Sequence, residues 1–499
     1  MRVRGGYPMK TQMLTLAACA VLAAVAEPAD ETATGRESPV RFDAGADFRL
    51  RQEIMDNLPG LPGGGPYAMT TTERAKYRNQ MRFRPRAWFE VETGPLRLYA
   101  RITDEFRYFP ASNDPKKRRP YYFPDEVFLD NLYLDAQGLE SPWLSAIGVE
   151  ALDFRLGRQD MLGPNGSIFG LNRIVVEGTP TDGSRSFYSD MARTTLHFDE
   201  TKQLDVFALY DSGRNEIRWG TSGSRGRSLN CINMTDSNDL DEWGGGLVYS
   251  QTALEGHLPF KLYSIFKRTE AHTKGSGANE IRVSPKEITT LGVLLQPQFT
   301  ENWGMEVEAA KQVGRICDGN REAGGHMAHV ELRYMTDFLR AYKPTFSWAT
   351  TYYSGDRHRT EPDDTDTAWD PMWGRYTQDS EMLVYGTLYE NCWWSNMIYT
   401  KLKLTMKFGP RHGFYVYSGP MFAAVQDHLG RADHDGSTFK GVLSAARYDF
   451  PIRLAPKKAT GFDRVEVFAH VVGELFNPGD YYDSSKPAFF FRWQVDFRF

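Results

Sequence analysis

The chain has 499 residues, of which 41% are hydrophobic and 25% are charged, and its net charge at pH 7 is −5. Its mean hydropathy of −0.50 is that of an ordinary water-soluble protein. Beyond the N-terminus, no apolar run reaches the ~20 residues that a membrane-spanning helix needs. The sequence therefore excludes a helical membrane protein, and any crossing of a membrane has to be made by strands.

The N-terminus has the pattern of a secretory signal peptide. Basic residues precede the apolar stretch 13–26, which ends in a small-residue A-x-A site at Ala26. We predict a signal peptide over residues 1–26, followed by a short segment over 27–46. Cys19 also fits a lipoprotein box, but that reading leaves a very short apolar segment, so cleavage after Ala26 is preferred.

Segments in which apolar and polar residues alternate recur through the rest of the chain. Such alternation places one kind of side chain on each face of a strand. We predict about eighteen strands, an even number, as bacterial barrels require. They lie near residues 47–55, 78–93, 95–109, 125–136, 146–159, 190–199, 203–212, 242–252, 258–269, 289–299, 302–314, 325–337, 343–354, 394–408, 413–427, 437–450, 463–476 and 487–499. The fold class predicted for residues 47–499 is all-β, a transmembrane antiparallel β-barrel of the outer-membrane porin type.

The connections between these strands alternate in length. Short turns such as 93–95 and 200–202 follow even-numbered strands, whereas long polar connections such as 160–189 and 355–393 follow odd-numbered ones. The connections at 137–145 and 451–462 are longer than this rule. The alternation predicts short periplasmic turns, long outer loops and a place in the bacterial outer membrane.

Side-chain parity assigns many basic residues to the water-filled face of their strands. Lys or Arg facing lipid at the bilayer centre costs roughly 2–4 kcal/mol, so we expect them to face the lumen. These residues are Arg49, Arg51, Arg82, Arg84, Arg86, Arg97, Arg101, Lys401, Lys403, Lys407, Arg492 and Arg498. They either guide anions or fill the interior in pairs with Glu53, Glu90, Glu92, Glu105 and Asp496. A barrel of about eighteen strands is wide enough for an aqueous channel, which favours the first alternative.

The C-terminal strand alternates without a break. Phe491, Trp493, Val495, Phe497 and Phe499 share one face, which suits lipid. A final strand that ends in Phe resembles the assembly signal of bacterial outer-membrane barrels. We therefore expect the barrel-assembly machinery to recognise the chain through its terminal residue, and outer-membrane lipid to surround the barrel.

Several motifs resemble the alginate-export family of outer-membrane porins, in the same order along residues 47–499. They are Arg84-Pro85, Phe154-Arg155-Leu156-Gly157-Arg158-Gln159, Arg185-Ser186-Phe187 with Asp190 and Arg193, Trp369-Asp370-Pro371-Met372-Trp373, and Leu475-Phe476-Asn477-Pro478-Gly479-Asp480.

The resemblance implies a monomeric barrel whose basic lumen passes an anionic polysaccharide. It adds Arg155 and Arg158 to the lumen residues. The chain departs from the family where alginate exporters place lumen arginines, since these positions carry Asp130, Asp160, His470 and Val472. The resemblance thus extends to a channel of that architecture, and alginate itself does not carry over.

No pattern predicts a cofactor or a nucleic acid partner. Asp363, Asp364 and Asp366 supply oxygen ligands for calcium but lack the glycine and the spacing of a calcium loop, so a solvated loop is favoured over a metal site. Cys231, Cys317 and Cys392 have no metal-site spacing, and the sequence leaves their pairing open.

We expect a passive channel for anionic saccharides or oligosaccharides, in export or in uptake. The histidines form no group with a nucleophile or a carboxylate, so no enzyme is expected. Two alternatives stay open: a barrel that binds surface glycans through its outer loops, and an outer-membrane enzyme with a site at the rim.

Overall fold

The computed structural model describes residues 40–57, 77–103, 106–108, 128–160, 162–163, 166–167, 169–171, 173–174, 189–211, 216–218, 231–233, 241–252, 258–274, 281–317, 321–357, 365–370, 372–373, 380, 382, 395–426, 437–454, 465–481 and 486–499. The signal peptide predicted over 1–26 lies outside these residues. No helix among them is long and apolar enough to cross a membrane.

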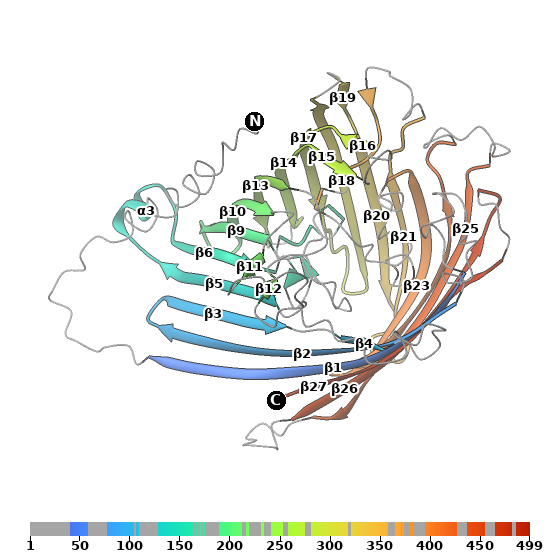
Figure 1. The fold of residues 1–499 in the computed structure, drawn as a ribbon, viewed down its shortest axis with the longest axis horizontal. Coiled ribbons are helices and arrows are strands. Elements are labelled where there is room, and N and C mark those ends of the chain that lie inside the picture. Colours follow the sequence, from blue (N-terminus) through green and yellow to red (C-terminus); the bar gives the residue numbers. More distant parts are fainter. Residues whose placement is uncertain are drawn as a thin grey trace.

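Eighteen strands close into one antiparallel barrel (Figure 1), which confirms the predicted fold class. Each barrel strand pairs with the barrel strand that follows it, and β1 pairs with β27 to close the ring. The barrel strands are β1 (Arg41–Asp56), β2 (Tyr77–Thr93), β3 (Leu96–Thr103), β5 (Phe128–Leu139), β6 (Ala151–Gln159), β9 (Ser189–His197), β10 (Lys202–Asp211), β13 (Glu242–Gln251), β14 (Phe260–Thr269), β17 (Lys286–Leu295), β18 (Trp303–Ile316), β20 (His326–Met335), β21 (Thr345–Tyr353), β23 (Met397–Gly409), β24 (His412–Phe422), β25 (Phe439–Arg453), β26 (Glu466–Pro478) and β27 (Ala488–Arg498). Each predicted segment overlaps one of them.

Two strands begin five or more residues away from the predicted position. β1 begins at Arg41 rather than 47, because residues 41–46 pair with β2 before β27 joins on the other side. β6 begins at Ala151 rather than 146, because α3 (Pro142–Ala146) occupies the turn before it. Ser141 caps this helix by accepting a hydrogen bond from the Leu144 N–H, and proline is favoured in a first turn.

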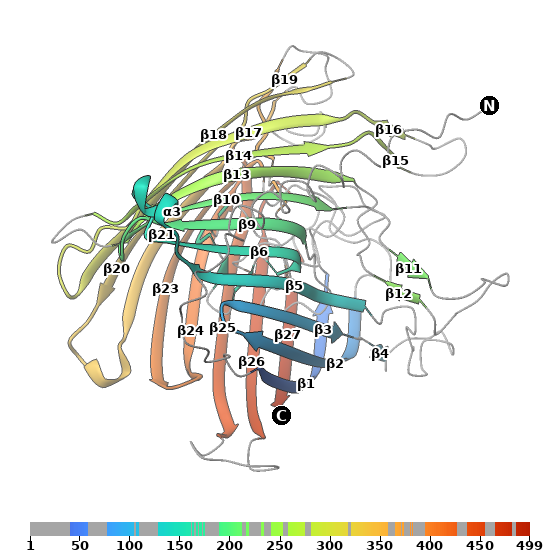
Figure 2. The ribbon, with the colours of Figure 1, turned by 90° about the vertical axis from the view of Figure 1, so that its left-hand side faces the viewer.

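The remaining elements lie in the connections. They are β4 (Phe106–Tyr108), β7 (Leu162–Gly163), β8 (Gly166–Ser167), β11 (Glu216–Arg218), β12 (Cys231–Asn233), β15 (His272–Lys274), β16 (Ile281–Val283), β19 (Arg321–Ala323), β22 (Thr365–Asp366) and η3 (Arg340–Tyr342). Figure 2 shows α3 at one end of the barrel, and β11, β12, β15 and β16 at the other end. Short turns and long connections therefore occupy opposite ends, as the alternation of their lengths predicts.

The outer face of the barrel is apolar. Large hydrophobic side chains on every second position of the strands are exposed there, and none of the described segments covers them. Examples are Phe89, Leu98, Ile102, Leu247, Leu262, Leu291, Phe346, Trp348 and Leu402. In a spanning barrel this face meets lipid, so exposure costs nothing.

On part of the inner face, from β10 to β21, buried apolar side chains pack against segments of two outer loops. Phe169, from the loop between β6 and β9, stacks on Phe207 of β10 with ring centroids 4.5 Å apart. Trp373, from the loop between β21 and β23, meets the same ring edge-on at 6.3 Å. These two loops thus enter the barrel and occupy space beside this part of the wall.

Candidate lumen site

The basic residues predicted to face water gather mainly on neighbouring strands. Those of β27, β1, β2, β3 and β6 form a continuous group, which we call the arginine wall: Arg49, Arg51, Arg82, Arg84, Arg86, Arg97, Arg101, Arg155, Arg158 and Arg492. The strand register explains the grouping. Arg51 lies opposite Arg82 on one side and Gln494 on the other, and Arg49 lies opposite Arg84.

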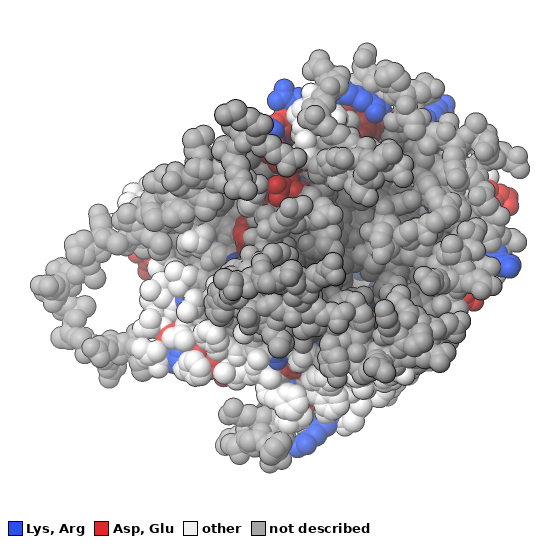
Figure 3. Space-filling model, viewed as in Figure 1, with Lys and Arg blue, Asp and Glu red and all other residues white. Residues whose placement is uncertain are grey.

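Most of the arginine wall is buried. Arg49, Arg51 and Arg492 are 1% exposed, and Arg82 and Arg84 are 6% exposed. In the space-filling view of Figure 3, described side chains of both charges appear close together, at the upper and right-hand edges and in the lower part of the view. The wall is therefore an interior polar layer and not an open basic surface.

Glu53 of β1 is the centre of this layer. Its carboxylate lies 2.8 Å from Arg492, 3.1 Å from Arg51 and 3.5 Å from Arg82, and it is fully buried. Gln80 donates a further hydrogen bond of 2.5 Å to it. One carboxylate thus holds three guanidinium groups.

Two further carboxylates are shared in the same way. Asp47 lies 2.9 Å from Arg86 and 3.9 Å from Arg84. Asp135 accepts from Arg97 at 2.7 Å and from Arg155 at 2.5 Å. Each of these two carboxylates therefore bridges two arginines of the wall.

The glycine of the motif at 154–159 has a structural role beside this pair. Arg155 lies over the Tyr133 ring, 4.1 Å from its centroid. Gly157 faces Tyr133 across the strands with φ +126°, and a Cβ there would come within 2.2 Å of the Leu132 carbonyl oxygen. Only glycine allows this approach without strain.

Arg101 and Arg158 also have acidic partners. Asp130 accepts from Arg101 at 2.9 Å and from the Thr103 hydroxyl at 2.5 Å, and it is fully buried. Arg158 lies 2.9 Å from Asp190. The acids that the sequence offered as partners were Glu53, Glu90, Glu92, Glu105 and Asp496, and of these Glu53 and Glu90 pair with arginines of the wall. The structure adds Asp47, Asp130, Asp135 and Asp190, because these acids come from neighbouring strands whose register parity alone does not give.

The predicted lysines lie on a separate part of the wall, in β23. Lys401 Nζ lies 5.6 Å from the ring centroids of both Tyr399 and Tyr417, and Lys403 Nζ lies 4.9 Å from that of Tyr415. Arg498 is apart from both groups, exposed at the end of β27. The structure therefore brings the arginines together and leaves Lys401, Lys403 and Arg498 outside that group.

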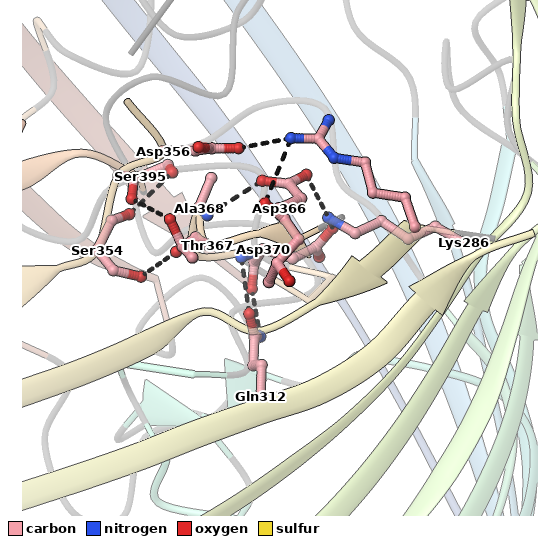
Figure 4. A network of polar contacts seen from close by, with 12 residues as sticks. Lys286, Gln312, Ser354, Asp356, Asp366, Thr367, Ala368, Asp370 and Ser395 are labelled. Carbon is pink, nitrogen blue, oxygen red and sulfur yellow. Dashed lines mark hydrogen bonds and ion pairs between the residues drawn. The ribbon is translucent and has the colours of Figure 1, made fainter. Parts of the chain in front are cut away.

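The outer loop between β21 and β23 is fastened to the wall by a polar network that the sequence did not reveal (Figure 4). Asp370 lies 3.3 Å from Lys267 of β14 and 3.4 Å from Lys286 of β17. Gln312 of β18 donates to the Asp370 carbonyl and accepts from its N–H, both at 2.8 Å. Arg321 and Asp356 form another ion pair of 2.9 Å.

Burial acts to raise the pKa of Asp370, but Lys267 and Lys286 outweigh it and lower this pKa to about 2. The carboxylate is therefore charged at neutral pH and holds both ammonium groups. Because Asp370 neutralises Lys267 and Lys286, these two lysines of the wall do not contribute free positive charge to the lumen.

The same loop also reaches β26. Glu474 of β26 accepts hydrogen bonds of 2.5 Å from the Ser380 hydroxyl and 2.9 Å from the Met382 N–H. In the order of the sheet, β26 is far from β14 and β17 in both directions around the ring. This loop, which we call the crossing loop, therefore bridges the interior from wall to wall.

Two glycines of the wall leave space in which the crossing loop packs. A Cβ at Gly244 would lie 2.7 Å from the Trp373 ring, and one at Gly325 would lie 2.7 Å from Trp369 Cα and 2.8 Å from the Ala368 carbonyl oxygen. The sequence signals were the run Gly244-Gly245-Gly246 and the motif Trp369-Asp370-Pro371-Met372-Trp373, and neither shows which surfaces meet.

The calcium candidates do not form a site within the described residues. Asp366 is bound by Lys286 at 3.7 Å and accepts from the Ala368 N–H, while Asp363 and Asp364 lie outside the described residues. The described part of the chain holds no group of three or more His, Cys, Asp or Glu suited to a metal. Cys317 is a free thiol, and the side chains of Cys231 and Cys392 are not among those described.

No protein-family profile and no curated protein match the chain. Solved structures do. OpdK of Pseudomonas aeruginosa with vanillate matches with a TM-score of 0.50 and 11% identity over 92% of this chain and 98% of that chain. OccAB1 of Acinetobacter baumannii matches with a TM-score of 0.50 and 9% identity over 93% and 99%. At such identities the likeness shows the fold alone, which is a closed antiparallel β-barrel.

A closed barrel with an apolar outer face and a polar inner face belongs in the bacterial outer membrane, since it satisfies every backbone group without a free edge. The chain is an outer-membrane barrel of the porin type.

Proposed function

We propose that the barrel is a passive channel for anionic saccharides or oligosaccharides and has no catalytic activity. The observation that carries this proposal is the sharing of carboxylates in the arginine wall. Glu53 faces three guanidinium groups, and Asp47 and Asp135 face two each. The arginines gathered on this part of the wall give the interior a positive potential, which attracts anions.

The resemblance to alginate-export porins supports a uronate-bearing solute. Long polymers fit the structure less well, because two outer loops lie inside the barrel and the crossing loop joins opposite parts of its wall. Short saccharide acids are therefore the preferred solutes. We further propose that the chain acts as a monomer in lipid and that Phe499 is its contact with the barrel-assembly machinery.

A second candidate solute is a small aromatic acid. One of the similar barrels is OpdK with vanillate. In this chain, lysines beside tyrosine rings offer both a charge and an apolar face, as Lys403 does over Tyr415. Glycan binding at the surface and rim chemistry have no comparable support among the described residues.

Liposome swelling tests the proposal directly. Vesicles that contain the purified barrel should swell faster in glucuronate than in glucose of the same osmolarity, because the two differ chiefly in charge. Equal rates would remove the anion preference, and no swelling in either solute would remove the channel. Vesicles without protein give the baseline.

A further inference from the structure

Two inward cations of the barrel lack the compensation that the arginine wall has. Among the described residues, Arg333 of β20 makes no ion pair, hydrogen bond or ring contact, and Lys403 of β23 contacts only the Tyr415 ring. Both side chains are partly exposed. An uncompensated charge attracts an anion more strongly than one that a carboxylate already neutralises.

The strand register places these two cations side by side. Arg333 lies opposite Ser347 of β21, and Ser347 lies opposite Lys403. Phe346 and Trp348, which flank Ser347, are 51% and 44% exposed on the lipid face, so Ser347 faces inward. Neighbouring strands are ~4.8 Å apart, which places the two cationic residues roughly 10 Å apart across one small serine.

Three carboxylates, Glu331, Glu306 and Asp449, lie around this place, and each has another contact. His329 Nε2 lies 4.0 Å from Glu331 and 3.9 Å from Glu306, and Glu306 also accepts from Gln296 at 3.0 Å. On the other side, Asp449 is held by Arg447 at 2.7 Å. None of these carboxylates forms an ion pair with Arg333 or Lys403.

We propose that Arg333, Ser347 and Lys403 form a binding site for the carboxylate of a ring-shaped organic acid. The site lies near the short-turn end of the barrel, which is periplasmic in this class. The two cations bind the carboxylate, the serine hydroxyl bonds an oxygen, and Tyr415 offers a flat apolar surface beside Lys403. The site deepens the proposed function by giving the anion a place to bind at the periplasmic mouth.

Calorimetric titration of the detergent-solubilised barrel tests the site without requiring conduction. The probes are glucuronate and benzoate, which separate a saccharide acid from an aromatic acid. The double substitution Arg333→Gln with Lys403→Gln should weaken binding of the preferred probe by at least about tenfold, since each charge-assisted contact is worth about that factor. Arg333→Lys should retain most of the binding, because it keeps the charge.

Arg340→Gln is the matched control. Arg340 is exposed on the adjoining turn and pairs with Glu301 at 3.0 Å, away from the site. Heat-dependent migration in SDS shows that each variant is folded, and Lys403→Gln alone serves where the double variant fails to assemble. Binding of both probes that is equal in wild type and variants, or absent from wild type, overturns the site. If binding depends on Arg333 and Lys403 but liposomes that contain the barrel do not swell, the site is supported and the proposed channel is contradicted.

Discussion

At the scale of single residues, we expect Glu53 to make a large contribution to the free energy of unfolding. It is buried among Arg51, Arg82 and Arg492, and removal of one partner from a buried ion pair costs about 3–5 kcal/mol because the remaining charges lose their compensation. Glu53→Ala should therefore lower the free energy of unfolding by about that amount in urea titration of the refolded barrel.

Glu92→Gln is the control for this prediction. Glu92 pairs with Arg41 at 3.8 Å near the end of the strands, where the arginine is largely exposed. Exposed pairs contribute about 0–1 kcal/mol, so the control should unfold close to wild type. Similar losses for both variants would show that Glu53 is only one of many polar fillers.

Asp370 makes the attachment of the crossing loop sensitive to acid. An unfolded aspartate has a pKa of about 3.9, whereas Asp370 has one of about 2, so the folded chain keeps this carboxylate charged at lower pH. The stabilisation is complete above about pH 4 and is lost as the pH falls toward 2. We expect single-channel conductance to change over this window.

Asp370→Asn should remove that change, because an amide cannot hold Lys267 and Lys286 by charge. Asp337→Asn, on an exposed turn beside Arg340, should leave the titration as it is in wild type. A pH response that persists in Asp370→Asn would assign it to other carboxylates.

Parity along a strand predicts that the arginines of β1, β2, β3 and β27 face inward, because a charge is stable only on the water-facing side of a strand. The family resemblance added Arg155 and Arg158. Their partners could not be found in the same way. Asp130 and Asp135 meet Arg101 and Arg155 only through the register between strands, which depends on turn length and bulges such as the one between Arg101 and Ile102.

At the scale of elements, two adjacent glycines allow a test of the crossing loop, because the loop packs closely on Gly325 and not on Gly324. A Cβ at Gly325 would collide with the backbone of Trp369 and Ala368, whereas one at Gly324 would meet only side-chain atoms at 3.6 Å or more. Gly325→Val should displace the loop from the wall and raise conductance. Gly324→Val should leave conductance near that of wild type. Equal conductance in both variants would show that the loop does not limit the passage.

The strands and short turns were predictable because each carries a local signal, alternation or a tight-turn sequence. The inward path of the crossing loop was not. Its contacts join Trp373 to Gly244 and Ser380 to Glu474, which are distant in sequence and show no periodicity.

At the scale of the whole molecule, closure depends on the last strand. β27 pairs with β1 through ten residues, and the Phe499 N–H donates a hydrogen bond of 2.9 Å to the Ala46 carbonyl. Deletion of Phe499 should reduce the fraction that reaches the outer membrane and shows heat-dependent migration in SDS. Phe299→Ala, an exposed aromatic on a short turn, should assemble as wild type does. Normal assembly of the truncated chain would exclude the terminal residue as the recognition signal.

The central claim is that the arginines gathered in the arginine wall make the interior attractive to anions. The reversal potential in a planar bilayer under a potassium chloride gradient measures this preference directly. We expect chloride to permeate more readily than potassium in wild type, and less so when Arg86 and Arg155 are both changed to Gln, which leaves Asp47 and Asp135 with fewer cations. Phe89→Leu, on the lipid face, should not alter the potential. A wild-type channel that prefers potassium, or one whose preference is unchanged in the double variant, would contradict the account.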